Sequence, residues 1–211
     1  FLTWLRERGT KFSLSSVRAD GLTPELLTIL RAAGLRTLTL ALEAPSPRLR
    51  AAANKQLSEE ALLAAVALAG KHGVNHLKFY LIIGWPGETE ADYDALRPLL
   101  DKVAAAASIG VGKRGVAHAT LSVNPLVPKP FTPMQWDPMA SEAAIEAGYA
   151  RVRAAVKGLK GFRVETETPS QARLQGLLAR GDETLFSLIV AAVEAGSFRR
   201  ALKRWDGDPA A

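Results

Sequence analysis

Three strand-like segments recur at a nearly constant spacing, and this spacing restricts the fold more than any other feature of the sequence. The segments begin near Leu35, Asn75 and Val116, so that 40 and 41 residues separate successive starts. Sequences with helical character fill the intervals. Such a repeat predicts parallel strands joined by helical crossovers, because a meander of hairpins would need only short turns between its strands.

The expected helices carry recognisable start and stop signals. Thr23 followed by Pro24 is a typical N-cap with proline at the first helical position, and Gly34 closes that helix. Ser58 opens a longer helix that ends at Gly73. Further helices are expected from Ser46, over 90–107, over 141–157 and up to residue 205.

The remaining strands complete an α/β pattern. Residues 11–17 alternate and predict a first strand, and 162–166 predict a short last one. The segment 75–83 is apolar nearly throughout, which predicts a strand covered on both faces. Four strands cannot close a useful barrel, so the sheet is either open or part of a larger barrel. Residues 108–115 are expected to form a loop, and 206–211 to fray.

A proline-rich stretch separates two parts of the chain. Five prolines fall within residues 125–138, a density that excludes regular structure. The stretch also contains Phe131, Met134 and Trp136, so we expect an ordered loop rather than a linker. We therefore predict one domain over 1–138 and a mostly helical extension over 139–211.

Composition bounds the chemistry and the compartment. The chain has 211 residues, a net charge of +6 and no cysteine, which excludes disulfides and any cysteine-held metal cluster in this chain. Three scattered histidines give no metal site. No apolar run approaches a membrane span, and the start lacks signal-peptide order, so a cytoplasmic protein is expected. The first residues have no initial Met and resemble the tail of a helix, which suggests part of a longer protein.

Polar residues at the predicted strand ends are candidates for a ligand site, because parallel sheets bind ligands there. Lys78 lies in an otherwise apolar strand, and Glu43 at the end of the neighbouring strand is its expected partner. Lys78 and Tyr80 share one face by strand parity. A structural ion-pair network would account for the same residues. Likewise Gly84 serves either a tight turn or close approach to a flat ligand.

Several motifs together resemble the later strands of radical SAM (S-adenosylmethionine) enzymes. The closest subgroup is uncharacterised radical SAM proteins with an upstream cobalamin-binding-like domain. The motifs are Ser-x-Arg-x-Asp at 16–20, Glu-Ala-x-x-x-Arg-Leu-Arg at 43–50, Asn54-Lys55, Leu-Lys-Phe-Tyr at 77–80, Gly-Trp-Pro-Gly-Glu-Thr at 84–89, the proline loop 127–136 and Arg-Gly-Asp at 180–182.

This resemblance implies part of a (β/α) barrel and a set of roles. In such enzymes a 4Fe-4S cluster on three cysteines cleaves SAM, and those cysteines are absent here. The chain would then be an inactive fragment that needs the missing N-terminal half of the barrel, with cobalamin in an upstream domain. The resemblance assigns SAM contacts to Ser16, Arg18, Glu43, Lys78, Ile83 and Gly84. It assigns substrate contacts to Tyr80, Asn124, Lys129 and Gln135.

A second hypothesis makes the chain a non-catalytic interaction module. The basic run Arg199-Arg200-Ala201-Leu202-Lys203-Arg204 and the proline loop would then hold RNA or a protein partner, although a solvated helix face also accounts for the run. Under either hypothesis a partial barrel leaves strand edges unpaired. We therefore expect self-association, or edges covered by the C-terminal helices.

Overall fold

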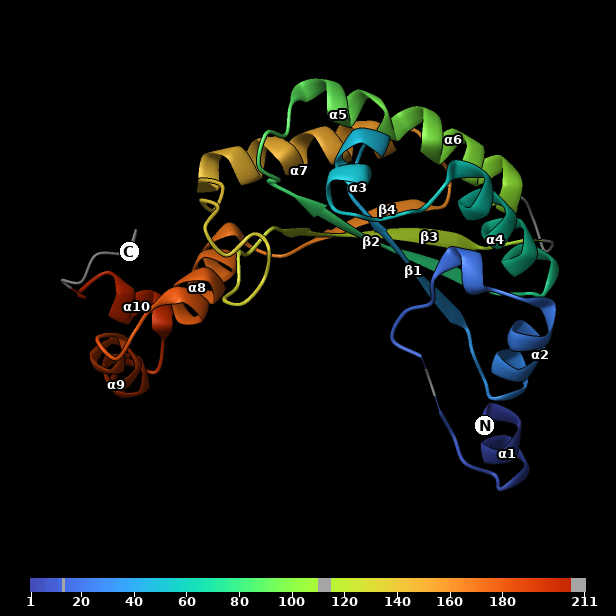
Figure 1. Ribbon diagram of the computed structural model, residues 1–211, viewed down its shortest axis with the longest axis horizontal. Coiled ribbons are helices and arrows are strands. Elements are labelled where there is room, and N and C mark those ends of the chain that lie inside the picture. The colour runs from blue at the N-terminus through green and yellow to red at the C-terminus, as the bar shows by residue number, and fades with distance from the viewer. Residues whose placement is uncertain (13, 110–114, 206–211) are drawn as a thin grey trace.

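A single parallel sheet organises the chain in the computed structural model, which describes residues 1–12, 14–109 and 115–205. The strands are β1 (Thr37–Glu43), β2 (His76–Ile83), β3 (His118–Pro125) and β4 (Phe162–Thr166). They lie in the order β1-β2-β3-β4, and each neighbouring pair is parallel. The predicted α/β class and partial (β/α) barrel are confirmed, as an open four-stranded sheet (Figure 1).

Helices connect the strands and begin where capping residues predict. Thr23 accepts a hydrogen bond from the backbone of Leu26 ahead of α2, and Ser58 accepts one from Ala61 ahead of α4. The helices up to β4 are α1 (Leu2–Glu7), η1 (Ala19–Gly21), α2 (Pro24–Ala32), α3 (Pro47–Ala52), α4 (Glu59–Lys71), α5 (Glu90–Asp94), α6 (Leu96–Ala107) and α7 (Glu142–Val156).

Only one face of the sheet is covered, which corrects the expectation for β2. Along β2 the residues alternate strictly between buried and half-buried. Leu77 and Phe79 are fully buried, whereas Lys78 and Tyr80 are not. Helices α4 to α7 lie on one side of the sheet in Figure 1, and no helix is drawn flat against the other side of β2. Polar side chains are tolerated on that second face, called here the open face, because water reaches it.

Two other expectations differ from the structure for identifiable reasons. In the described residues of the predicted strand over 11–17, pairing is reduced to one bridge, between Val17 and Leu40. Lys11 and Leu14 are exposed, so no packing holds the preceding residues in line. The helix expected over 90–107 is divided at Ala95, because Pro98 has no N–H to donate to the carbonyl of Asp94.

The C-terminal part packs in two ways. Tyr149 of α7 is fully buried in the main core, together with Ile145 and Val152. A separate cluster formed by Leu177, Leu185, Leu188, Ala192 and Ala201 joins α8 (Pro169–Arg180), α9 (Leu185–Ala195) and α10 (Phe198–Leu202). Packing thus groups α7 and β4 with the residues before 138, and the boundary at 138 stays a prediction.

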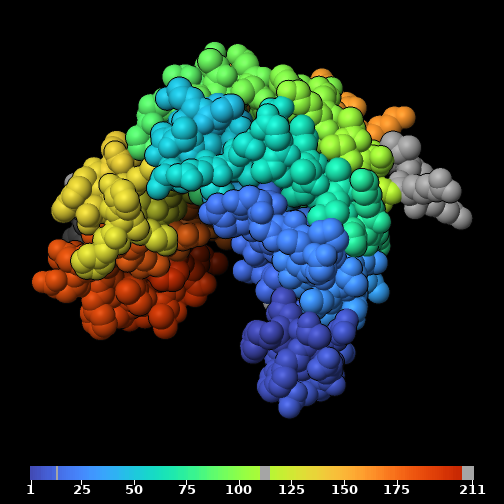
Figure 2. All heavy atoms as spheres, turned by 45° about the vertical axis from the view of Figure 1, so that its right-hand side comes forward, coloured from blue at the N-terminus to red at the C-terminus, as the bar shows by residue number. Residues whose placement is uncertain are grey.

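Residues 126–138 form a loop without helix, as predicted, whereas Pro125 still belongs to β3 and pairs with Ile83. In Figure 2 this loop and the C-terminal helices form one lobe, the N-terminal helices form another, and the surface is hollowed between them. The expected loop over 108–115 falls largely outside the described residues, and so does the expected fraying of 206–211. No helix in the described part of the chain is long and apolar enough to cross a membrane.

Candidate active site at the carboxyl ends of the strands

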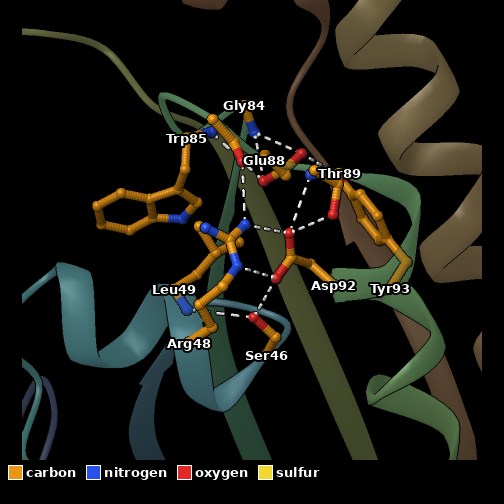
Figure 3. Close-up of polar contacts among 10 residues, drawn as sticks. Ser46, Arg48, Leu49, Gly84, Trp85, Glu88, Thr89, Asp92 and Tyr93 are labelled. Carbon is orange, nitrogen blue, oxygen red and sulfur yellow. Dashed lines mark hydrogen bonds and ion pairs between the residues drawn. The ribbon is translucent and has the colours of Figure 1, made fainter.

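The turn after β2 is held by an internal carboxylate (Figure 3). Glu88 accepts hydrogen bonds from the backbone N–H groups of Gly84 at 3.0 Å and Trp85 at 3.3 Å. The hydroxyl of Tyr93 donates to the same carboxylate. The indole N–H of Trp85 donates to the carbonyl of Ile82 at 2.9 Å. The turn is therefore rigid, and its first two amides already have an acceptor.

A buried carboxylate next to this turn ties it to α3. Asp92 accepts hydrogen bonds from Ser46 at 2.5 Å, from the guanidinium of Arg48 at 2.5 Å and from Thr89 at 2.9 Å. Burial raises the pKa of Asp92, but these donors outweigh it and hold the pKa below its ordinary value. Arg48 also donates to the carbonyl of Gly87 at 2.9 Å. The loops after β1 and β2 are thereby fixed relative to each other.

Tyr93 stays protonated in this arrangement. Burial raises the pKa of its hydroxyl, and the hydrogen bond to Glu88 raises it further. The hydroxyl can therefore act as a permanent donor to Glu88. Sequence reasoning gave no site role to Ser46, Arg48, Asp92 or Tyr93, although Thr89-x-x-Asp92 is a capping-box spacing.

The structure does not pair Glu43 with Lys78, and that expectation is wrong. Glu43 lies level with Leu81, about 10 Å along the strand from Lys78. Instead Glu43 binds Lys55 at 3.1 Å, and Lys78 binds Glu165 on β4 at 3.4 Å. Glu43 also has a positive φ of 70°, which turns the chain at the end of β1.

Ser16 and Arg18 lie beside β1. Val17 bridges to Leu40 and packs against the main core, so its two neighbours point to the opposite side of the sheet. The guanidinium of Arg18 binds Asp20 at 2.7 Å and remains largely exposed. By parity, both residues share the open face with Lys78.

Ile83 and Gly84 occupy the end of β2 in different ways. The side chain of Ile83 is fully buried in the core, and its carbonyl accepts the N–H of Leu126 at 2.8 Å. Gly84 has φ 77°, and a Cβ there would lie 3.0 Å from the Cβ of Ala140. The tight-turn explanation of this glycine therefore has direct support, and its contact with a ligand stays a prediction.

The four expected substrate residues fall into two groups. Tyr80 lies on the open face with the ammonium of Lys78 5.6 Å from its ring centre, which confirms their shared parity. Asn124 is level with Ile82, two residues further along the same face. Lys129 and Gln135 belong to the proline loop, where the Gln135 side chain accepts the N–H of Phe131 at 3.2 Å. The structure thus brings together only the first two.

A polar network at the other end of the open face was not expected. His76 contacts Thr120 at 2.7 Å and Thr37 at 3.3 Å through its two ring nitrogens. Arg163 donates to the same Thr120 hydroxyl at 2.7 Å. Burial lowers the pKa of His76, and the nearby positive charges of His118 and Arg163 lower it further.

An apolar cavity of about 440 Å³ lies beside the strand ends. Trp85 and Met134 are among its walls, and Asn54 and Lys129 contribute polar atoms. A cavity with this lining accepts a flat, largely apolar ring. No cluster of three or more histidine, aspartate or glutamate side chains suited to a metal occurs in the described ranges. With no cysteine in the sequence, an iron–sulfur cluster does not fit this chain.

Comparison with known proteins gives a family match and a similar relative. The family model of the radical SAM superfamily matches residues 5–100. The uncharacterized protein MJ0966 of Methanocaldococcus jannaschii is 35% identical over 203 residues, which is 95% of this chain and 42% of that protein. The chain thus spans less than half the length of this relative.

A solved structure is also similar in part. It is coproporphyrinogen III oxidase (HemN) from Escherichia coli, described as a radical SAM enzyme. The likeness has a TM-score of 0.48 and 18% sequence identity, and it covers 73% of this chain and 36% of that chain.

Proposed function

We propose that this chain forms the SAM- and substrate-contacting part of a radical SAM enzyme, because the family model of the radical SAM superfamily matches residues 5–100. The observation that carries this proposal is the position of the matched segment. It contains every residue to which a SAM contact was assigned: Ser16, Arg18, Glu43, Lys78, Ile83 and Gly84.

The side chains at the end of β1 have the right chemistry for SAM. Glu43 offers a half-buried carboxylate to an ammonium group, and its partner Lys55 can release it by turning toward a carboxylate. Arg18 offers an exposed guanidinium whose two-pronged geometry suits a carboxylate. The cavity next to Trp85 supplies an apolar surface for a ring.

The iron–sulfur cluster of such an enzyme would have to be bound by a different segment of the full protein. When bound in such an enzyme, SAM and the cluster together supply the radical chemistry. This chain supplies no thiolate, so we propose that the 211 residues alone are inactive and that a cysteine-bearing N-terminal half completes the barrel. The length of the relative, of which this chain matches 42%, supports a longer protein. Cobalamin in an upstream domain stays a prediction.

Binding of SAM tests the proposal directly. We would add SAM to the isotope-labelled chain and follow backbone amide signals by NMR. The expected shifts concern residues at the carboxyl ends of β1 and β2, including Glu43 and Gly84. Glu43→Gln should weaken binding about 10-fold or more, because a charged hydrogen bond is lost.

The matched control is Asp101→Asn, which alters an exposed carboxylate paired with Arg97 on α6. It should leave SAM binding unchanged. Equal binding by Glu43→Gln and the native chain, or shifts confined to other surfaces, would reject the site. A stoichiometric iron–sulfur absorbance after anaerobic reconstitution of the chain would reject the proposed need for another segment.

A further inference from the structure

Two neighbouring cavities with shared walls make up a groove between α7, α8, α10 and the end of the proline loop. Their volumes are about 580 and 680 Å³, and both are lined by Glu142 and Arg173. Trp136 lines one cavity and Trp205 the other. This groove, called here the C-terminal groove, is distinct from the cavity beside Trp85.

Positive charge predominates in the C-terminal groove. Its cations are Arg173, Arg180, Arg199 and Lys203, against two acids, Glu142 and Glu146. Arg199 and Lys203 are exposed and take part in no ion pair within the described part of the chain. Arg173 is paired only loosely, at 3.7 Å from Glu142. With respect to the described residues, Arg199 and Lys203 can therefore contact anionic groups of a ligand.

An unusually exposed aromatic ring stands at one end of the groove. The side chain of Trp136 is 85% exposed, although it is large and apolar. Its backbone is nevertheless fixed: the N–H of Asp137 donates to the carbonyl of Met134 at 3.0 Å, and Arg180 donates to the carbonyl of Asp137 at 3.0 Å. A flat ring that is open to solvent and attached to a fixed backbone suits stacking on another flat ring.

We propose that the C-terminal groove binds single-stranded RNA. Unpaired cations contact phosphates, and exposed aromatic rings stack on bases, which is the combination that single-stranded nucleic acids require. Glu142 and Glu146 would repel a ligand made of phosphates alone, but they can accept hydrogen bonds from ribose 2′-hydroxyls and base amino groups. The carboxylates thus favour RNA over DNA.

The groove also lies in a suitable place for a macromolecule. The loop that carries Trp136 follows β3 directly, and in Figure 2 this loop and the C-terminal helices form one outer lobe of the molecule. A long single-stranded RNA can therefore pass over the lobe without contacting the β-sheet. This inference does not depend on the proposed radical SAM function, because RNA binding requires neither SAM nor a cluster.

Fluorescence anisotropy with a labelled single-stranded oligoribonucleotide tests the inference on the full 211-residue chain. Trp136→Ala should weaken binding about 5- to 100-fold through the loss of stacking. Replacing Arg199 and Lys203 together by alanine should reduce the slope of log K against log salt by about 1.4, as expected for two lost phosphate contacts.

Matched controls separate this site from general attraction to a basic protein. Lys157 and Lys160 are two exposed cations, at the far end of α7 and beyond it; their double alanine variant removes the same charge. Trp4→Ala removes an exposed tryptophan from α1. Both controls should bind RNA like the native chain.

Three outcomes would overturn the inference. One is an absence of RNA binding at low salt, which would mean that the groove binds a protein partner or no partner. Another is an equal loss of affinity in the Lys157/Lys160 control, which would indicate unspecific electrostatics. The third is equal or tighter binding of single-stranded DNA of the same sequence. Circular dichroism of each variant identifies loss of folding, and a misfolded Trp136→Ala would be replaced by Trp136→Leu.

Discussion

Lys78 on β2 binds Glu165 on β4 at 3.4 Å, so this ion pair crosses the intervening strand β3 on the open face. Glu165 also lies 3.5 Å from Arg163. Both cations and the carboxylate remain partly exposed to water. The pair therefore orders polar side chains above the sheet more than it stabilises the fold.

Replacing this carboxylate should have a small effect on stability. For Glu165→Gln we expect the free energy of unfolding to fall by less than about 1 kcal/mol, because partly exposed ion pairs are weak. Urea unfolding followed by circular dichroism measures this change. Glu183→Gln, at an exposed position on the C-terminal lobe, is the control. A loss several times larger would mean that the pair supports the sheet itself.

Asp92→Asn should lower the free energy of unfolding far more than Glu165→Gln does. Its carboxylate is buried and accepts hydrogen bonds from Ser46, Arg48 and Thr89, and an amide cannot accept them all. We expect a loss of about 2–3 kcal/mol in the free energy of unfolding, since donors around a buried carboxylate lose charged hydrogen bonds. Asp101→Asn, which alters an exposed i,i+4 pair on α6, should cost about 0.5 kcal/mol or less.

Acid should destabilise the fold through protonation of the Asp92 carboxylate. The folded pKa of Asp92 lies below the value near 3.9 of an unfolded aspartate, so its contribution is complete above that pH and is lost as the pH falls below it. Native protein should therefore lose more stability than Asp92→Asn between about pH 4 and pH 2. An equal loss of unfolding free energy in the native protein and in Asp92→Asn over this pH range would contradict the assignment to Asp92.

Gly84→Ala tests the geometry of the turn. The glycine has φ 77°, and an added Cβ would meet Ala140 at 3.0 Å. We expect a loss of about 1–2 kcal/mol from the left-handed backbone alone. Gly21→Ala is the matched control, because its φ is not positive and no atom lies within 4 Å of the added Cβ. Equal stability of the two variants would count against the strained-turn explanation.

His76 should make stability depend on pH near neutrality. Its folded pKa is lowered by burial and by neighbouring positive charge, whereas an unfolded histidine titrates near 6.5. The unfolded state therefore binds more protons, and stability should fall as the pH drops below about 6.5. The groups around His76 are His118, Arg163 and Lys78, which disfavour its charge, and Glu165, which favours it.

NMR titration of the His76 ring, with urea unfolding at pH 7.5 and pH 5.5, measures both parts of this prediction. His76→Gln should flatten the pH dependence of the free energy of unfolding. A His76 pKa at or above that of a free histidine would contradict the prediction.

Local signals in the sequence predicted local structure well. Thr23 and Ser58 determine where their helices start through contacts three residues away, so the sequence alone suffices. Residues 11–17 show the limit of this reasoning. Their alternation is typical of a strand, but among the described residues of the segment only Val17 finds a partner, because pairing depends on packing that the segment itself does not contain.

Contacts between distant segments were harder to predict. Testing whether Lys78 faces Glu43 requires the register between β1 and β2. Identifying Glu165 as the partner of Lys78 requires the position of β4 in the sheet, because Glu165 lies 87 residues after Lys78 in the chain. The Asp92 cluster shows the same difficulty, since Arg48 lies 44 residues before its partner. The Thr89-x-x-Asp92 spacing predicts a cap but not the guanidinium beside it.

The alternation along β2 has an evolutionary consequence. Leu77, Phe79 and Leu81 pack against the helices, whereas Lys78 and Tyr80 leave that layer untouched. Mutations of Lys78 and Tyr80 change which ligands the open face recognises, and they leave the packing between sheet and helices intact. Descendants of one ancestral chain can therefore diverge in chemistry at Lys78 and Tyr80 while the same aliphatic layer keeps them folded.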